Sequence, residues 1–155
     1  MVKQSADERT IGQNRKARHR FELLETVECG LVLRGSEIKS LRERAASLDE
    51  AYARLENGEI WLLGCHIAPY THAHTEKHEP LRRRKLLLHR SEIRKLLPKV
   101  EQKGLTLVPV RLYFNERGIA KVTLALAKGK SSADKRHSLK AREDQREMDR
   151  ARKRH

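Results

Sequence analysis

Residues 108–128, VPVRLYFNERGIAKVTLALAK, contain two segments in which apolar and polar side chains alternate. Alternation with a period of two is typical of strands buried on one face. The four residues NERG between the segments have the length of a hairpin connection. Pro109 cannot donate to a strand ladder, so the first strand should lie at a sheet edge or carry a bulge. The residues expected on one face of each strand are Val108, Val110, Leu112 and Phe114 in the first and Val122, Leu124 and Leu126 in the second.

Further strands are expected on the N-terminal side of this hairpin. Asn57 and Gly58 give the strongest hairpin signal in the chain, because both residue types tolerate positive φ. They separate AYARL, residues 51–55, from EIWLLGCHI, residues 59–67. RFELLETVE, 20–28, and CGLVLRG, 29–35, predict two more strands, and RKLLLH, 84–89, is a sixth candidate.

Two segments change to helical spacing. SEIRKLLPKVEQKG, 91–104, has apolar residues at i, i+3, i+4 and i+7, with Ser91 as N-cap and Gly104 as C-terminal stop. Pro98 should kink or split this helix. GSEIKSLRERAASL, 35–48, predicts a second helix capped by Ser36. The sequence therefore predicts a mainly β fold with helices, a small antiparallel barrel of about six strands with two or three helices.

The apolar residues divide the 155-residue chain into three parts. Residues 1–19 are polar and predict a flexible basic N-terminal arm, and 20–130 form the core-bearing barrel domain. Residues 131–155 contain only two large apolar residues, Leu139 and Met148, and cannot bury a core of their own. This tail is expected to be disordered when free.

The charge of the chain indicates a polyanionic partner. There are 35 Lys and Arg against 21 Asp and Glu, a net charge of +14 at pH 7. No apolar run approaches the roughly 18 residues of a spanning helix, and the polar start lacks a signal peptide, so a soluble cytoplasmic protein is expected. Aromatic residues are scarce, which favours structured RNA over single strands held by serial stacking.

Candidates for catalysis or metal binding are weak. THAHTEKHEP, 71–80, brings together His72, His74, Glu76 and His78, with His66 more remote, and such side chains can hold zinc. The alternative is a polar loop whose histidines face water or phosphate. AKGKSS lacks the earlier glycine of a phosphate loop. Cys29 and Cys65 are expected to be small buried residues. No enzyme activity, metal or cofactor is expected, although a metal-dependent nuclease stays open as an alternative.

A run of cations in PLRRRKLLLHR, 80–90, is the clearest local basic cluster of the core stretch. Strand alternation should divide Arg82, Arg83, Arg84 and Lys85 between two faces, with one set on an open surface where it neutralises phosphates.

Several stretches resemble the SsrA-binding protein (small protein B) family in order and spacing. They are NRKARHRFELLETVECGLVLRGSEIKSLR at 14–42, RRRKLLLH at 82–89, GLTLVPVRLYF at 104–114, and KVTLALAKGK at 121–130 followed by DKR. The resemblance covers roughly residues 12–150. It implies an oligonucleotide-binding-like barrel and a non-catalytic bacterial protein of trans-translation, which binds the tRNA-like domain of transfer-messenger RNA and delivers it to stalled ribosomes. A ribosomal or general structured-RNA-binding protein is the alternative.

The resemblance also implies the RNA contacts. Asn14, Glu28, Leu87 and Lys121 match family positions that contact the tRNA-like domain. Glu28 would accept from a base amino group or 2′-hydroxyl, or hold a neighbouring arginine, and Leu87 would pack on RNA if it faces outward rather than into the barrel. The complete expected set is Asn14, Arg15, Lys16, Arg18, Glu28, Arg84, Lys85, Leu87 and Lys121.

The tail is expected to contact the ribosome, at the small-subunit decoding centre and along the mRNA channel. If it becomes helical there, Arg142, Arg146, Arg150 and Arg154 form a basic stripe at i+4 spacing. Ala133 stands where the family usually has an aromatic residue or histidine, which puts a stacking contact in doubt, and His137 lies beyond the Asp-Lys-Arg triplet. The expected ribosome-binding set is Lys128, Lys130, Asp134, Lys135, Arg136, Lys140, Arg142, Arg146 and Arg150. The free protein is expected to be a monomer.

Overall fold

The structure is a computed structural model that describes residues 9–72, 77–101, 103–130 and 132–154. Its strands are β1 (Thr10–Gln13), β2 (Phe21–Leu31), β3 (Ala46–Ser47), β4 (Tyr52–Glu56), β5 (Glu59–Leu63), β6 (His66–Ile67), β7 (Arg84–Leu87), β8 (Thr106–Phe114) and β9 (Ala120–Gly129). Its helices are α1 (Arg15–Arg20), α2 (Gly35–Arg42), α3 (Arg90–Glu101) and α4 (Ser132–Lys153).

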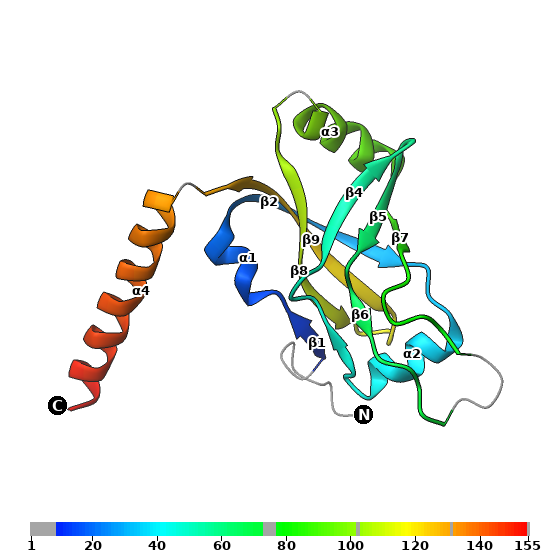
Figure 1. The fold of residues 1–155 in the computed structure, drawn as a ribbon, viewed down its shortest axis with the longest axis horizontal. Coiled ribbons are helices and arrows are strands. Elements are labelled where there is room, and N and C mark those ends of the chain that lie inside the picture. The colour runs from blue at the N-terminus through cyan, green and yellow to red at the C-terminus, as the bar shows by residue number, and fades with distance from the viewer. Residues whose placement is uncertain (1–8, 73–76, 102, 131, 155) are drawn as a thin grey trace.

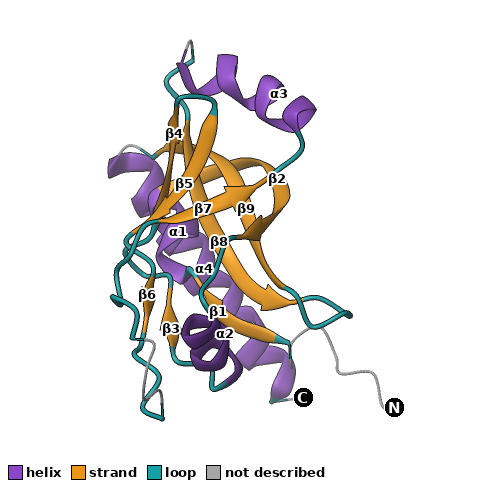
Figure 2. Cartoon of the chain, turned by 90° about the vertical axis from the view of Figure 1, so that its right-hand side faces the viewer, coloured by secondary structure: helices purple, strands orange, loops and turns teal. Residues whose placement is uncertain are grey.

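Six antiparallel strands close into a barrel. The sheet order is β1-β8-β4-β5-β7-β2-β9, and pairing of β8 with β9 joins the two ends, leaving β1 as an added strand beside β8. α3 lies over one end of the barrel and α2 toward the other in both views (Figures 1 and 2). The prediction of a small barrel with about six strands is therefore confirmed.

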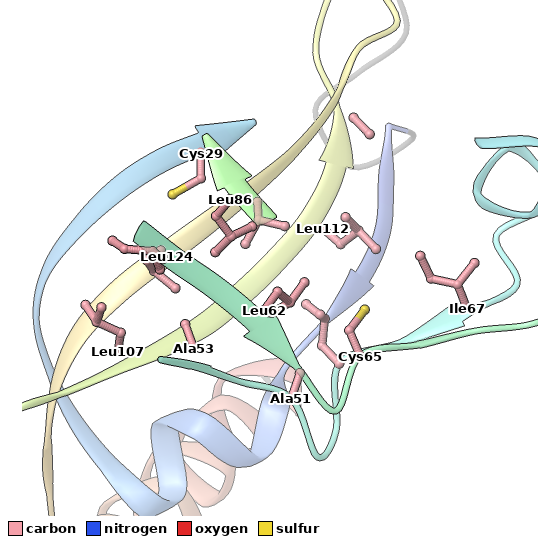
Figure 3. Close-up of a cluster of buried hydrophobic side chains, with 14 of the residues drawn as sticks. Cys29, Ala51, Ala53, Leu62, Cys65, Ile67, Leu86, Leu107, Leu112 and Leu124 are labelled. Carbon is pink, nitrogen blue, oxygen red and sulfur yellow. The ribbon is translucent and has the colours of Figure 1, made fainter. Parts of the chain in front are cut away.

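The barrel interior holds one continuous apolar core. Figure 3 shows side chains from β2, β5, β7, β8 and β9 meeting inside the ring, among them Cys29, Leu62 and Leu124, which are fully buried. Leu41 from α2 and Leu96 from α3 belong to the same cluster, so both helices pack against the core of the barrel. The two cysteines are buried and free, as expected, and burial raises the pKa of the Cys29 thiol to about 12 and that of Cys65 to about 11.

β8 contains a bulge at Pro109, and the bulge changes which of its residues point into the barrel. The register with β9 shifts between Pro109 and Arg111, as its missing N–H favours. Leu107 and Leu112 consequently both enter the main core, although strict alternation would put them on opposite faces. Val108 instead packs outside the barrel with Ala17 of α1. The bulge was predicted, but the assignment of Val108 and Leu112 to one face was wrong, and β8 has partners on both sides.

One strand, β2, replaces the two strands expected over 20–35 and ends at Leu31. β2 keeps its inside-outside alternation through Glu28 and Cys29, and its pairing with β9 continues from Phe21 to Gly30 with one register shift. The hairpin at Asn57 and Gly58 is confirmed, because both residues have positive φ and Glu56 pairs with Glu59 across the turn.

Both predicted helices are present, with different starts. The prediction of one helix over 35–48 was wrong at its C-terminal end, because α2 ends at Arg42 and β3 follows. α3 already begins at Arg90, with Glu92 accepting from the His89 amide, so Ser91 is not its N-cap. Pro98 lies within α3 without splitting it, and Gly104 follows with φ of +65°. In α2 the N-cap is Arg34, not Ser36.

The N-terminal boundary of the domain was placed too late. β1 pairs with β8, and α1 buries Ala17 against Val108 and Ala127, so the described part of the expected flexible arm belongs to the fold. At the other end, α4 runs as a helix that projects from the barrel near α1 (Figure 1). Disorder of this tail in the free protein stays a prediction.

Candidate nucleic-acid interface

One outer face of the barrel brings together three of the residues expected to contact RNA. Cross-strand pairing places Leu87 of β7 opposite Gly30 of β2, Gly30 opposite Lys121 of β9, and Lys121 opposite Tyr113 of β8. In the adjacent row Glu28 lies opposite Thr123, and Thr123 opposite Arg111. The face defined by Leu87, Glu28, Lys121, Arg111 and Tyr113 is called the β7–β2–β9–β8 face below.

Glu28 occupies the centre of this face between two donors. The Tyr113 hydroxyl donates to Glu28 Oε2, and Lys121 Nζ lies 3.9 Å from Glu28 Oε1. Burial and the bond to Glu28 raise the pKa of Tyr113 to about 12, so its hydroxyl remains protonated at neutral pH. The carboxylate thus lies in a cationic, hydrogen-bonded setting although it is itself 56% exposed.

Leu87 faces outward. Its side chain is 49% exposed, whereas the neighbouring Leu86 is buried in the core. A Cβ at Gly30 would lie 3.4 Å from Leu87 Cβ, so glycine leaves the apolar surface of Leu87 uncovered on that side. An exposed leucine beside a lysine and a glutamate can pack against a base or ribose while the charged groups meet polar atoms.

Arg84 is a correction to the expected RNA-binding set. Its side chain is fully buried and pairs with the fully buried Glu37, while Nη1 donates to the Cys65 carbonyl at 2.7 Å. Burial alone would raise the pKa of Glu37, but bonds from Arg82, the Arg34 amide and Arg84 outweigh it and hold that pKa below its usual value. Arg84 is therefore a structural residue of the barrel interior and cannot reach RNA.

The remaining cations of that run lie outside the barrel. As predicted, alternation separates Arg84, which faces the core, from Arg83 and Lys85, which face outward. Lys85 points outward and pairs with Glu59 at 2.9 Å, and Arg83 stacks over Trp61 at 4.1 Å from the ring centre. Lys85 therefore lies beside β5 and close to Leu87 on its own strand.

Asn14 has a structural role in the free protein, and its contact with RNA stays a prediction. It is only 5% exposed, its side-chain carbonyl accepts from the Ala17 amide as the N-cap of α1, and its amide donates to the Pro109 carbonyl at 3.0 Å. These bonds fix α1 against the bulge of β8. The structure thus gives Asn14 a role in placing α1, whose residues Arg15, Lys16 and Arg18 are exposed as expected.

α1 lines a cavity of about 300 Å³ with the loop before β4. Lys16 pairs with Glu50 at 3.0 Å and Arg20 with the same carboxyl at 4.0 Å. The bond from Lys16 and the charges of Lys16 and Arg20 hold the pKa of Glu50 below its usual value. Arg15 and Arg18 add exposed positive charge to the same helix.

The predicted tail contacts start at the end of β9. Lys128 is exposed, while Lys130 Nζ donates to the Arg18 carbonyl at 2.9 Å and so joins the start of the tail to the C-terminal end of α1. Asp134 and Lys135 lie within α4. The other predicted tail residues are exposed on α4: Arg136, Lys140, Arg142, Arg146 and Arg150.

The histidine cluster does not assemble as a ligand set among the described residues. His78 is 4% exposed, with Nδ1 at 2.9 Å from Ser36 Oγ and Nε2 at 2.9 Å from the Ile67 carbonyl, so it joins the loop to α2 and β6. His72 makes an edge contact with Tyr70. His74 and Glu76 lie outside the described residues.

Two residues of the β7–β2–β9–β8 face were missed from the sequence. Arg111 lies 4.3 Å over the Tyr113 ring, and its Nε donates to Thr10 Oγ1 at 2.8 Å. The available signal was alternation along β8, which puts residues 111 and 113 on the same side, next to Lys121 in the paired strand. Among the described residues, no helix is long and apolar enough to cross a membrane.

The comparisons with known proteins agree with one another. The model of the SmpB protein family matches residues 11–154. The chain is 54% identical to an SsrA-binding protein of Symbiobacterium thermophilum, over 97% of this chain and 96% of the relative. An SsrA-binding protein of Nostoc sp. is 53% identical over 99% of both chains.

A solved chain has a similar fold. Its structure is described as "tmRNA-SmpB: a journey to the center of the bacterial ribosome". The match has a TM-score of 0.65 and 51% sequence identity, and covers 82% of this chain and 92% of the solved one. Taken with the near full-length matches in sequence, it shows that the chain belongs to the SmpB protein family.

Proposed function

We propose that this protein binds the tRNA-like domain of transfer-messenger RNA through the β7–β2–β9–β8 face and delivers that RNA to stalled ribosomes. The observation that carries the proposal is the cross-strand alignment of Leu87, Gly30 and Lys121 beside Glu28. The relatives are SsrA-binding proteins, and the solved relative is described with tmRNA in the bacterial ribosome.

Each side chain has a physical role in this proposal. Lys121 neutralises a phosphate, and Leu87 packs on a base or ribose. Glu28 accepts from an amino group or a 2′-hydroxyl, since its carboxylate would repel phosphate. Arg15, Lys16 and Arg18 of α1 provide further phosphate contacts beside this face, and Lys85 extends the positive charge along β7.

The tail has a separate role. α4 is exposed along its described side chains and carries Arg142, Arg146 and Arg150 at i+4 spacing. Such a helix has no apolar face to bury, so its packing partner is RNA, namely the small-subunit mRNA channel. A message that still occupies the channel would exclude the tail, which makes tail binding a test for stalling.

The protein acts in this scheme as a non-catalytic, cytoplasmic monomer. Recognition and delivery require surfaces that bind, with no bond made or broken by the protein. The buried, hydrogen-bonded state of His78 argues against the metal-dependent nuclease alternative, which used the histidine loop. Incubation of the protein with labelled RNA, with and without a chelator, tests this directly, and chelator-sensitive cleavage would contradict it.

Competition binding tests the RNA partner. Labelled tRNA-like domain bound to the full chain is challenged with unlabelled tRNA-like domain or with an RNA duplex of equal length. Preferential displacement by the tRNA-like domain is expected, whereas equal displacement would support a general structured-RNA-binding protein.

Deletion of residues 131–155 tests the separation of the two roles. The truncated protein should keep nearly full affinity for the tRNA-like domain but fail to support tagging on ribosomes stalled in a purified translation system. Loss of both properties would contradict separate roles for the barrel and the tail.

A further inference from the structure

Tyr113 spans the centre of the β7–β2–β9–β8 face. β9 lies between β8 and β2, and the Tyr113 hydroxyl reaches across it to donate to Glu28 Oε2. On its own strand, Arg111 covers the Tyr113 ring, with the guanidinium 4.3 Å from the ring centre. Across the ladder Tyr113 is the partner of Lys121. The phenol is thus held by Arg111 on its own strand and by Glu28 two strands away.

This arrangement restricts a glutamate that would otherwise rotate freely. Glu28 is 56% exposed, and an exposed glutamate loses considerable rotamer entropy when it is fixed on binding. A hydrogen bond made before RNA arrives reduces that loss on binding. A carboxylate has about four lone-pair sites, so the bond from Tyr113 still leaves acceptor capacity toward RNA.

We infer that Tyr113 is a positioning residue for RNA recognition, because it holds the Glu28 carboxylate in the orientation that accepts from amino or 2′-hydroxyl donors of the RNA. The inference rests on the proposed RNA-binding function. Tyr113 acts through Glu28 rather than on RNA directly, because its hydroxyl is committed to Glu28 and one ring face is covered by Arg111. The raised pKa of Tyr113 keeps the donor proton in place across the physiological pH range.

A double-mutant cycle tests this role. The full-length protein and its Tyr113→Phe, Glu28→Ala and doubly substituted variants are titrated with the tRNA-like domain of a bacterial transfer-messenger RNA at one salt concentration. Tyr113→Phe keeps the ring under Arg111 and removes only the hydroxyl. It should weaken binding roughly fivefold to tenfold in the native background and not further in the Glu28→Ala background.

Two controls separate positioning from general damage. Tyr70→Phe removes a hydroxyl from a tyrosine that contacts Lys39 and His72, outside this face and outside α1, and should leave the affinity unchanged. The melting temperature of Tyr113→Phe should stay within a few degrees of the native value, because the ring keeps its packing and only one hydroxyl of a partly exposed residue is removed.

Three results would overturn the inference while leaving RNA binding intact. They are native-like affinity of Tyr113→Phe, no loss of affinity in Glu28→Ala alone, and an equal loss from Tyr113→Phe with or without Glu28, which would indicate direct contact of the phenol with RNA. Failure of the native protein to prefer the tRNA-like domain over a duplex would instead overturn the proposed function, and the inference with it.

Discussion

Replacement of Arg84 by methionine should destabilise the barrel more than any other single change in the cation run. Arg84 and Glu37 are both fully buried, and Glu37 also accepts from the Arg34 amide at 2.9 Å. Arg84 further donates to the carbonyls of Cys65 at 2.7 Å and Pro80 at 3.2 Å. Methionine fills similar volume but leaves Glu37 paired with the partly exposed Arg82 in place of two cations.

The expected loss follows from these contacts. Removing one partner of a buried ion pair typically costs about 3–5 kcal/mol, and the pairing of Glu37 with Arg82 that remains places the expected loss at the lower end of this range. For a chain of this length such a loss lowers the melting temperature by roughly 10 °C. Arg83→Met is the matched control. That side chain is 49% exposed, and surface pairs contribute only about 0–1 kcal/mol.

Urea unfolding followed by circular dichroism measures both variants. The midpoint should fall clearly for Arg84→Met and only slightly for Arg83→Met, with similar slopes. Equal stability of the two variants would refute the assignment of Arg84 as a structural residue. Reduced RNA affinity of Arg84→Met at native stability would refute it as well, and would restore Arg84 to the RNA-binding set.

Further predictions concern the core, the acid limit and the thiols. Leu86→Ala should destabilise the protein by about 2–5 kcal/mol in urea unfolding, whereas Leu87→Ala should leave stability nearly unchanged and weaken RNA binding; similar effects on stability would show that Leu87 is not outward-facing. The pKa of Glu37 is lowered in the folded protein, so the stability it contributes is present above the ordinary value of 4.5 and is lost as pH falls through the folded value. Unfolding free energies measured from pH 7 to pH 3 should therefore fall less steeply for Glu37→Gln, and an unchanged slope would count against this assignment. Cys29 and Cys65 should resist iodoacetamide at pH 8 until denaturant is added, because burial raises both pKa values; rapid alkylation of the native protein would contradict their burial.

The barrel could be predicted because its strands alternate over enough residues to define two faces. The hairpins at Asn57-Gly58 and around 115–118 fixed which neighbouring strands pair. Alternation could not predict which residues of a strand point inward after a bulge. Pro109 indicated the bulge itself, but its effect on Val108 and Leu112 depends on how many residues shift, which the hydrogen-bond register decides.

The site could be predicted only in part, because several of its contacts join residues that are far apart in the sequence. A charged residue at an inward position contradicts the usual rule that charges stay outside, so Arg84 was assigned to RNA although its partner Glu37 was present in the expected α2 segment. The burial of Asn14, a residue that the resemblance assigns to RNA contact, could not be predicted because it depends on the distant Pro109 carbonyl. Tyr113 needed the register of three strands before its contact with Glu28 could be seen.

The measurement that tests the central proposal most directly compares two substitutions that each remove one positive charge. Lys121→Gln removes one cation from the β7–β2–β9–β8 face, and Arg54→Gln removes one that is 58% exposed on β4. Affinity for the tRNA-like domain is measured for each over a series of salt concentrations. Lys121→Gln should weaken binding and reduce the slope of log affinity against log salt by about 1, while Arg54→Gln should change neither. Equal effects of the two substitutions would show that net charge, and not this face, determines RNA binding.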